Sequence, residues 1–373
     1  MTSIIIEIND AALSISEGGE LLLESPGYAV LDGDQLYLGN EALKLARIRP
    51  RWTNNRFWAE LGNEPLSGAT PQLRHHADLA YAHLASVWKQ AGEPDCEVVF
   101  AVPGSWTTEQ LGLLLGLAEE LGMKVRCLVD AALAACAGSA EHNLSHLDIS
   151  LHRVVLSELS GGDTLARRRL LVLAEEGLVH FNNLWADTIA DQFVHATRFD
   201  PMHSAATEQQ IHDQLPACLL ELNAHATAVV AVDDAGKQYS VTVRRDQLVS
   251  AAAAAYPRIV RQLQQSAGGG PILLSERFSG FPGLEDALAV VPGISIEKLT
   301  PGSAARGCVA ALEMIDPPSD EVRYYTELPR SKQSSAAVPT AEPAPTHLLF
   351  RGQAWVLGAS PTLLGVNGGA VHA

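Results

Sequence analysis

The sequence predicts an α/β protein that is built from two similar halves. Each half opens with strands joined by tight turns and continues with helices that alternate with short buried strands. This order occurs once before and once after residue 146, which indicates a duplicated domain. The chain has 373 residues, of which 47% are hydrophobic, so it is large enough for each half to bury a core.

The first half is expected to cover residues 1–145. It begins with a strand at 3–8 and two strands at 13–16 and 20–24, because Gly18-Gly19 marks a turn between the last two. Thr107 begins a capping-box pattern before an apolar helix. The remaining elements follow in order: a hairpin at 28–38, helices at 41–48 and 77–89, a strand at 96–102, a helix at 107–121, a strand at 123–129 and a helix that begins at Asp130.

The second half is expected to cover residues 146–316. Its elements are strands at 147–156 and 169–174, helices at 183–197 and 206–222, a hairpin at 227–243, one long helix at 246–266, a strand at 271–274, a helix at 283–290, a strand at 294–299 and a helix at 303–315.

The composition changes after this half. Residues 317–346 are rich in proline, serine and alanine, which is typical of a flexible linker. The tail, 347–373, contains an apolar run at 347–356 that predicts a strand pair or a strand docked on an exposed edge. The glycine-rich end from Gly358 is expected to be poorly ordered.

Charge and cysteine usage restrict the class of protein. The formal net charge is -17, which repels phosphate backbones and argues against nucleic-acid binding. The five cysteines form no Cys-x-x-Cys pair, so neither a disulfide framework nor a zinc site is predicted. The start MTSIIIEIND lacks a basic, extended apolar signal, and no run is long enough to span a membrane. We therefore expect a cytoplasmic protein without a membrane span or a metal centre.

Three stretches resemble the DnaK-type seventy-kilodalton heat-shock proteins of the actin-like ATPase superfamily. The run from Val98 to Gln110 resembles that family's strand ending in Val-Pro-Ala, and the run from Leu128 to Gly138 resembles its Asn-Glu-Pro-Thr-Ala-Ala-Ala helix start. The runs 176–187 and 299–311 are similar to two of its helix entries. The resemblance covers about residues 1–315 and implies a two-lobed actin-like, duplicated ribonuclease H-like fold. The family's peptide-binding domain is not recognisable.

The resemblance also implies an ATP or ADP site with magnesium, but its loops are altered. The first phosphate loop, Asp-x-Gly-Thr-Thr in the family, reads Glu7-Ile8-Asn9-Asp10-Ala11 here. Glu7 can stand for the acid, while Asp10 replaces a hydroxyl and repels phosphate. The alternative interpretation is an ordinary strand end with a solvated turn.

The second phosphate loop has lost all of its glycines. The family's Asp-x-Gly-Gly-Gly-Thr corresponds to a stretch from Asp148 to Arg153 that includes Ser150. Backbone that wraps phosphate needs glycine, so this loop is expected to bind phosphate weakly or not at all. Arg153 either binds an anion through its side chain or forms a salt bridge.

The adenosine loop and the catalytic acid complete the implied site. The family's Gly-Gly-x-Ser-Arg corresponds to Ser275-Glu276-Arg277, in which Glu276 would crowd the nucleoside. Asp130 aligns with the acid that positions water, but it can also be a helix N-cap. Glu7, Asp130 and Asp148 are therefore candidate catalytic remnants, and any nucleotide is expected to be bound weakly or lost.

Three functions remain open at this point. The first is a non-hydrolysing or very slow pseudo-ATPase that acts as a protein-interaction module, for which Trp52, Phe57 and Trp58 are a candidate partner face. The same aromatic residues can instead belong to the core. The second is a genuine ATP-binding switch with divergent loops. The third is an actin-like component of a larger assembly.

Overall fold

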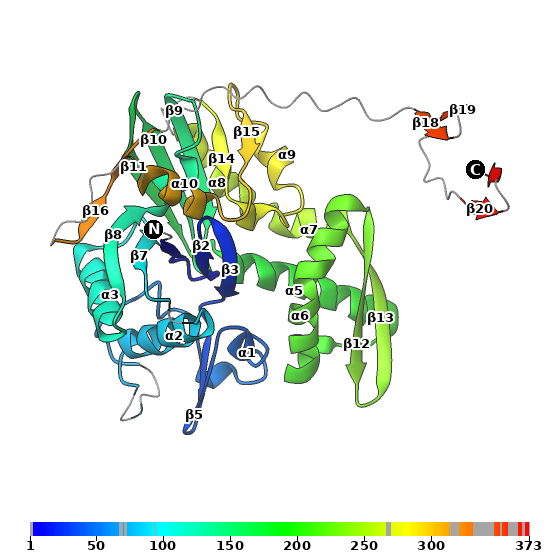
Figure 1. Cartoon of the computed structure of the whole chain (residues 1–373). Helices are drawn as coiled ribbons and strands as arrows, with labels where there is room; N and C mark the ends of the chain where they lie inside the picture. Colours follow the sequence, from blue (N-terminus) through cyan, green and yellow to red (C-terminus); the bar gives the residue numbers. More distant parts are fainter. Residues whose placement is uncertain are drawn as a thin grey trace. The chain divides into compact units, whose positions relative to one another are not determined.

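The computed structural model describes residues 3–66, 70, 73–92, 94–265, 270–312, 314, 321–330, 347–350, 353–356, 365–367 and 370–372. These residues form a mixed α/β structure, as predicted (Figure 1). The chain divides into two units, Met1–Ser331 and Lys332–Ala373.

The first unit contains a six-stranded sheet with the order β16-β8-β7-β1-β2-β3. Its strands are β1 (Ile4–Glu7), β2 (Leu13–Glu17), β3 (Glu20–Ser25), β7 (Glu97–Val102), β8 (Lys124–Asp130) and β16 (Arg323–Tyr325). On one side of β1 the strands form an antiparallel meander, and on the other side β7, β8 and β16 run parallel to it.

A second six-stranded sheet has the order β15-β14-β9-β10-β11-β17. Its strands are β9 (Asn143–Ile149), β10 (Arg153–Ser160), β11 (Thr164–Ala174), β14 (Ile272–Leu274), β15 (Ile296–Lys298) and β17 (Glu327–Pro329). Strand β9 corresponds to β1, because it also has an antiparallel meander on one side and parallel strands on the other. Five strands of each sheet therefore share one plan, whereas the sixth lies beside the parallel strands in the first sheet and beside the meander in the second.

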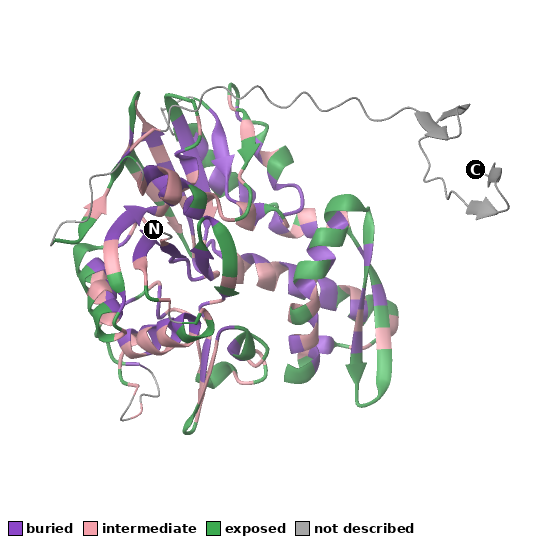
Figure 2. Ribbon diagram, viewed as in Figure 1, coloured by how far each residue is buried: buried purple, intermediate pink, exposed green. Residues whose placement is uncertain are grey.

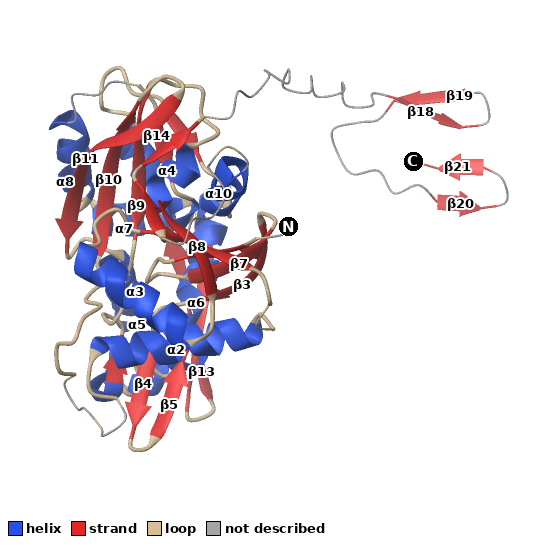
Figure 3. Cartoon of the chain, turned by 60° about the vertical axis from the view of Figure 1, so that its left-hand side comes forward, coloured by secondary structure: helices blue, strands red, loops and turns tan. Residues whose placement is uncertain are grey.

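Helices form three layers around these two sheets (Figures 1 and 3). Buried residues of α4 (Ala131–Cys136) and α10 (Ser303–Leu312) join side chains of both sheets in one apolar cluster, so these helices lie between the sheets. The first sheet's other face packs on α2 (His76–Gln90) and α3 (Thr108–Glu120). The second sheet's other face packs in one cluster with α5 (Leu178–Thr197), α6 (Ala205–Ala224), α7 (Arg245–Ala252), α8 (Tyr256–Gln265) and α9 (Leu284–Leu288).

Two smaller sheets extend this arrangement. One contains β4 (Ala29–Asp32), β5 (Gln35–Leu38) and β6 (Thr53–Asn54), with α1 (Gly39–Leu43) and the short 3-10 helix η1 (Pro50–Trp52) beside it. The other is the hairpin of β12 (Thr227–Asp234) and β13 (Lys237–Arg244), which runs alongside α6 in Figure 1. The 3-10 helices η2 (Pro201–His203) and η3 (Glu276–Phe278) complete the unit.

Local sequence signals account for several of these elements. The side chains of β1 alternate between the two helix layers, since Ile4 and Ile6 pack toward α2 and α3 while Ile5 packs toward α4 and α10. Figure 2 shows the resulting purple interior of the sheets. Thr107 caps α3, and its hydroxyl accepts a hydrogen bond from the amide of Gln110, as the capping-box pattern predicts.

Four sequence predictions are wrong in detail. The strand expected at 147–156 is two strands, β9 and β10, joined by a turn at 150–152. The helix expected at 246–266 is α7 and α8, because Pro257 is accommodated only near the start of a new helix. The helix expected at 41–48 ends at Leu43. The predicted linker contains β16 and β17, one on an edge of each sheet.

The second unit contains two hairpins in its described residues. Strand β18 (His347–Phe350) pairs with β19 (Gln353–Val356), which confirms the expected strand pair. Strand β20 (Gly365–Asn367) pairs with β21 (Ala370–His372). The linker prediction for 331–346 lies outside the described residues.

Candidate functional site

The predicted site residues gather where strands of the two sheets end. Glu7 is the last residue of β1, and Asp148 lies near the end of the corresponding strand β9. Asn9 and Asp10 follow β1 directly, and Ser150 follows β9. Asp130 ends β8, while Ser275 and Glu276 follow β14. The structure thus brings together residues that are far apart in the sequence.

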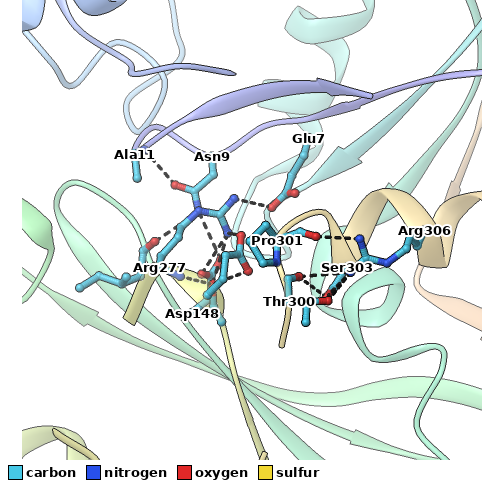
Figure 4. A network of polar contacts seen from close by, with 12 residues as sticks. Glu7, Asn9, Ala11, Asp148, Arg277, Thr300, Pro301, Ser303 and Arg306 are labelled. Carbon is cyan, nitrogen blue, oxygen red and sulfur yellow. Dashed lines mark hydrogen bonds and ion pairs between the residues drawn. The ribbon is translucent and has the colours of Figure 1, made fainter. Parts of the chain in front are cut away.

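Arg277 lies at the centre of this group and links the two sheets (Figure 4). Its Nη2 donates to Oε1 of Glu7 at 2.7 Å, and its Nη1 donates to Oδ1 of Asp148 at 3.3 Å. Glu276 is a third carboxylate, 3.6 Å from Nη1. The Arg277 side chain is only 13% exposed. A buried guanidinium therefore neutralises carboxylates from both halves of the unit.

Asn9 strengthens the link between the two strand ends. Its Nδ2 donates to Oδ2 of Asp148 at 3.2 Å and to the carbonyl oxygen of Ile149 at 3.3 Å. Its own side-chain oxygen accepts from the amide of Ala11 at 2.9 Å. The side chain of Asn9 therefore has all of its polar atoms engaged within the protein.

The ionisation of this group follows from burial and from the guanidinium. Burial is the largest influence on the pKa of Asp148 and raises it, but the charges of Arg277 and His146 together with hydrogen bonds from Ser275 and Ile149 hold that pKa below its ordinary value. Burial acts to lower the pKa of Arg277, but the charges of Glu7 and Asp148 raise this pKa well above the usual range. For Glu276 burial dominates and raises the pKa. The guanidinium thus stays charged, with Asp148 ionised beside it.

Asp10 holds the turn between β9 and β10. Its Oδ1 accepts from the amide of Leu151 at 2.6 Å, and burial raises its pKa despite this hydrogen bond. The same turn also binds the first amides of α5. The amides of Leu178 and Val179 donate to the carbonyl oxygens of Ser150 and Leu151, each at 2.9 Å. Backbone amides that are free in an anion-binding loop are therefore paired here.

Arg153 and His152 connect the second sheet to residues 55–59. Nη2 of Arg153 donates to the carbonyl oxygen of Ala59 at 3.0 Å, and Nε2 of His152 lies 3.0 Å from the carbonyl oxygen of Asn55. The sequence left two alternatives open for Arg153, an anion site and a salt bridge. The contact found here is neither, because its acceptor is a backbone carbonyl oxygen.

Asp130 is a helix cap, as one of its two interpretations predicts. Its Oδ1 accepts from the amides of Ala132 and Leu133 at 3.0 and 3.3 Å, which caps α4. Its Oδ2 lies 2.6 Å from Nη1 of Arg167, a residue that sequence reasoning missed. Burial raises the pKa of Asp130 although Arg167 opposes this. The absence of a side chain at Gly104 leaves room for this ion pair.

Ser275 has a local role as the cap of η3. Its hydroxyl accepts from the amide of Arg277 at 3.4 Å and thereby fixes the turn that directs Arg277 toward Glu7. The pattern Ser-x-Arg after a strand is visible in the sequence. It does not indicate which carboxylates the arginine pairs with.

The cavity beside these residues is small. Its volume is about 60 Å³, and its lining includes Asn9, Asp148, His146 and Trp58. Pockets for small ligands measure about 300–1,000 Å³. His146 was not predicted, and burial lowers its pKa.

The predicted aromatic partner face is wrong in part. Phe57 and Trp58 are 0% and 1% exposed and belong to the core of the first sheet. Nε1 of Trp58 donates to Nδ1 of His83 at 2.9 Å, which explains why the indole can be buried. Trp52, in contrast, is 47% exposed.

Among the described residues no group of three or more His, Cys, Asp or Glu side chains is arranged to hold a metal ion. In the same part of the chain no helix has both the length and the apolar character needed to cross a membrane. No protein-family model matches the sequence, and comparison with curated proteins finds no match.

Proposed function

We propose that this chain is a divergent relative of the actin-like ATPases, similar to the nucleotide-binding part of DnaK-type chaperones, that acts by binding protein partners. In this proposal ATP hydrolysis is lost or very slow. The shared strand plan of the two sheets, with helices α4 and α10 between them, supports a duplicated two-lobed fold. The collinear sequence resemblance over residues 1–315 supports the same relationship.

The contact of Arg277 with Glu7 and Asp148 carries the functional part of the proposal. Both carboxylates lie at the strand ends where the resemblance implies magnesium and phosphates, and a positive group of the protein already neutralises them. A magnesium ion needs oxygen ligands that are free to coordinate it. To bind there, it would have to displace a buried guanidinium from two ion pairs.

The surrounding backbone argues in the same direction. The amides of Ala11 and Leu151 already donate to side-chain oxygens, and those of Leu178 and Val179 to carbonyl oxygens. Phosphate binding depends on such amides being unpaired and directed at the ligand. With a cavity of about 60 Å³, the residues present do not fit a nucleotide with magnesium, so we derive no hydrolytic step.

Nucleotide binding is the test of this proposal. The melting temperature of the full chain should not change when Mg·ATP or Mg·ADP is added at millimolar concentration. A ligand at 100 times its dissociation constant would stabilise the protein by about 2.7 kcal/mol, which a thermal shift detects readily. A saturable shift that disappears in Asp148→Asn would contradict the proposal.

One observation favours a second candidate, an ATP-binding switch. Glu7, Asn9 and Asp148 do converge from the two sheets, so withdrawal of Arg277 would leave an acidic group suited to a cation. Arg277→Ala tests this possibility directly. If the switch exists, this variant should be stabilised by Mg·ATP; we expect no stabilisation, because the paired amides remain.

A further inference from the structure

The segment from Ala42 to Trp58 is strongly basic in an acidic protein. It contains Lys44 and four arginines but no carboxylate, whereas the whole chain has a formal net charge of -17. Such a local reversal of charge makes this segment the place where an anionic group would be attracted.

Most of these cations already have partners within the unit. Arg47 contacts Glu208 on α6, and Arg49 forms an ion pair with Asp32. Arg56 pairs with Glu60 and Glu175. Lys44 and Arg51 are exposed and make no ion pair with any residue that the structure describes. Two positive side chains are therefore available to a partner.

Exposed apolar side chains lie beside these two cations. Leu43, Ile48 and Trp52 are 38%, 43% and 47% exposed, and they fall within ten positions of the chain. We call residues 43–52 the Trp52 knob. It begins at the last residue of α1 and ends with η1, next to the β4–β5 hairpin, and exposed residues in green mark α1 in Figure 2. An exposed tryptophan with aliphatic and cationic neighbours is typical of a binding hot spot.

The backbone of the Trp52 knob is held in place before any partner arrives. The amides of Arg49 and Trp52 donate to the carbonyl oxygens of Leu45 and Arg49 at 2.8 and 3.1 Å. The Thr53 hydroxyl bonds to the carbonyl oxygen of Arg49 at 2.9 Å. Nε2 of Gln209 on α6 donates to the carbonyl oxygen of Leu43 at 3.1 Å. Preorganisation of this kind reduces the entropy that is lost on binding.

We infer that the Trp52 knob docks an acidic amphipathic protein segment. Apolar side chains of the partner would cover Trp52 and Ile48, while its carboxylates would pair with Lys44 and Arg51. A nucleic acid is a poorer match, because its continuous phosphate charge would meet repulsion from the rest of this acidic chain. The inference rests on the proposed role as a protein-binding module, but it does not depend on whether a nucleotide binds at the strand ends near Arg277.

A displayed library of random peptides of about eleven residues, enough for three helical turns, tests this inference. Peptides are selected on the full chain, and their dissociation constants are then measured by fluorescence anisotropy. The recovered sequences should combine Asp or Glu with aromatic or aliphatic residues. Trp52→Ala should weaken binding by about 30-fold or more, as expected for a hot spot. Lys44→Glu with Arg51→Glu should weaken it by at least about tenfold, and added salt should weaken it further.

Leu220→Ala with Arg261→Glu is the matched control. Leu220 is 67% exposed on α6, and Arg261 is exposed on α8 with no ion pair among the described residues. This variant makes the same kind of change at another surface and should bind the selected peptides within about twofold of the wild type. Circular dichroism melting of each variant separates lost binding from lost folding.

Several outcomes would overturn the inference. Equal binding to Trp52→Ala, or selected peptides without acidic residues, would do so. It would also fail if an oligo-dT strand or anionic phosphatidylserine vesicles bound the knob more tightly than the peptides, or if Trp52→Ala abolished self-association of the chain. Mg·ATP binding is measured separately on the same variants, so a working nucleotide site would defeat the proposed pseudo-ATPase without affecting the peptide result.

Discussion

Replacement of Arg277 by methionine is the most informative single change in this protein. The substitution removes the positive charge and keeps an apolar side chain of comparable length. It leaves Glu7 and Asp148 without their guanidinium, and these side chains are 9% and 20% exposed. Removing one member of a buried ion pair costs about 3–5 kcal/mol. We expect a loss of this size in the free energy of unfolding, measured by urea titration at pH 7.

The two carboxylates should contribute unequally to this loss. Asp148 keeps the hydrogen bond from Asn9, whereas Glu7 has no other hydrogen-bond partner among the described residues. Adding Glu7→Gln to Arg277→Met should therefore recover more than half of the lost stability. Adding Asp148→Asn instead should recover less. This comparison separates the destabilisation caused by an unpaired buried carboxylate from any loss of packing around position 277.

The pH dependence provides a second test of the same reasoning. In the wild type, burial raises the pKa of Asp148, but Arg277, His146 and hydrogen bonds together lower it below its ordinary value. The stability that this lowered pKa contributes is present at neutral pH and is lost in acid. Arg277→Met removes the largest of the influences that lower this pKa, so the pKa should rise and the deficit should shrink as the pH falls from 7 toward 5. A deficit that is constant over this range would refute the electrostatic explanation.

Arg306→Met is the matched control, because Figure 4 shows this second arginine bound only to neutral groups. Arg306 is exposed and donates to the carbonyl oxygens of Pro301 and Thr300 at 2.7 and 3.3 Å. Its replacement should cost about 1 kcal/mol or less. If Arg277→Met were no more destabilising than this control, the assignment of Arg277 as the group that neutralises Glu7 and Asp148 would be wrong.

Three further predictions concern other parts of the unit. Burial lowers the pKa of His83 from 6.5 to about 4, so acidification through this range should cost about 3 kcal/mol of stability in urea titrations, and less in His83→Gln. Gly307→Ala should cost about 2 kcal/mol or more in the same assay, because a Cβ would overlap a carbonyl oxygen of α4, whereas Gly112→Ala, in open space on α3, should be neutral or stabilising. Gln210 and Gln214 pair their side-chain amides with the backbone of β12, so replacing both by leucine should expose a strand edge and cause concentration-dependent association in light scattering.

The sequence predicted most elements because their signals are local. Thr107 and Asp130 cap helices through contacts within three residues, and alternating apolar residues define β1. The candidate site residues came from a different source. Glu7, Asp10 and Asp148 were singled out because the stretches that contain them resemble the phosphate loops of the DnaK-type family.

The contacts that determine the character of the site are not local. Arg277 and Glu7 are separated by 270 positions, and Asn9 and Asp148 by 139. Any arginine of the chain could in principle neutralise a given carboxylate, and the choice depends on how the two sheets pack. For the same reason the partner of Asp130 was missed, because Arg167 reaches it from the other sheet.

Residues 321–330 show how this limitation also hid a structural element. Strand β16 pairs with β8 of the first sheet, and β17 pairs with β11 of the second. Each strand has only three residues, too few for a recognisable period. Yet Leu328 is fully buried, and the Tyr324 hydroxyl lies 3.5 Å from Oδ2 of Asp130. This segment therefore connects the same two sheets that Arg277 connects.

We expect this segment to be required for the stability of the first unit. A chain that ends at residue 320 should unfold at lower urea concentration than one that ends at residue 331. Burial of Leu328 alone is worth about 1.5–3 kcal/mol, and loss of the pairing of two strands adds to it. Amide hydrogen exchange should locate the effect, with faster exchange in β8 and β11 than in β12.

In the full chain, Leu328→Ala should reproduce about 2–5 kcal/mol of destabilisation, whereas Leu220→Ala at an exposed site should change little. Equal stability of the two shortened chains would mean that residues 321–330 add nothing to the contacts by which Arg277, Asn9, Arg167 and the central helices join the sheets.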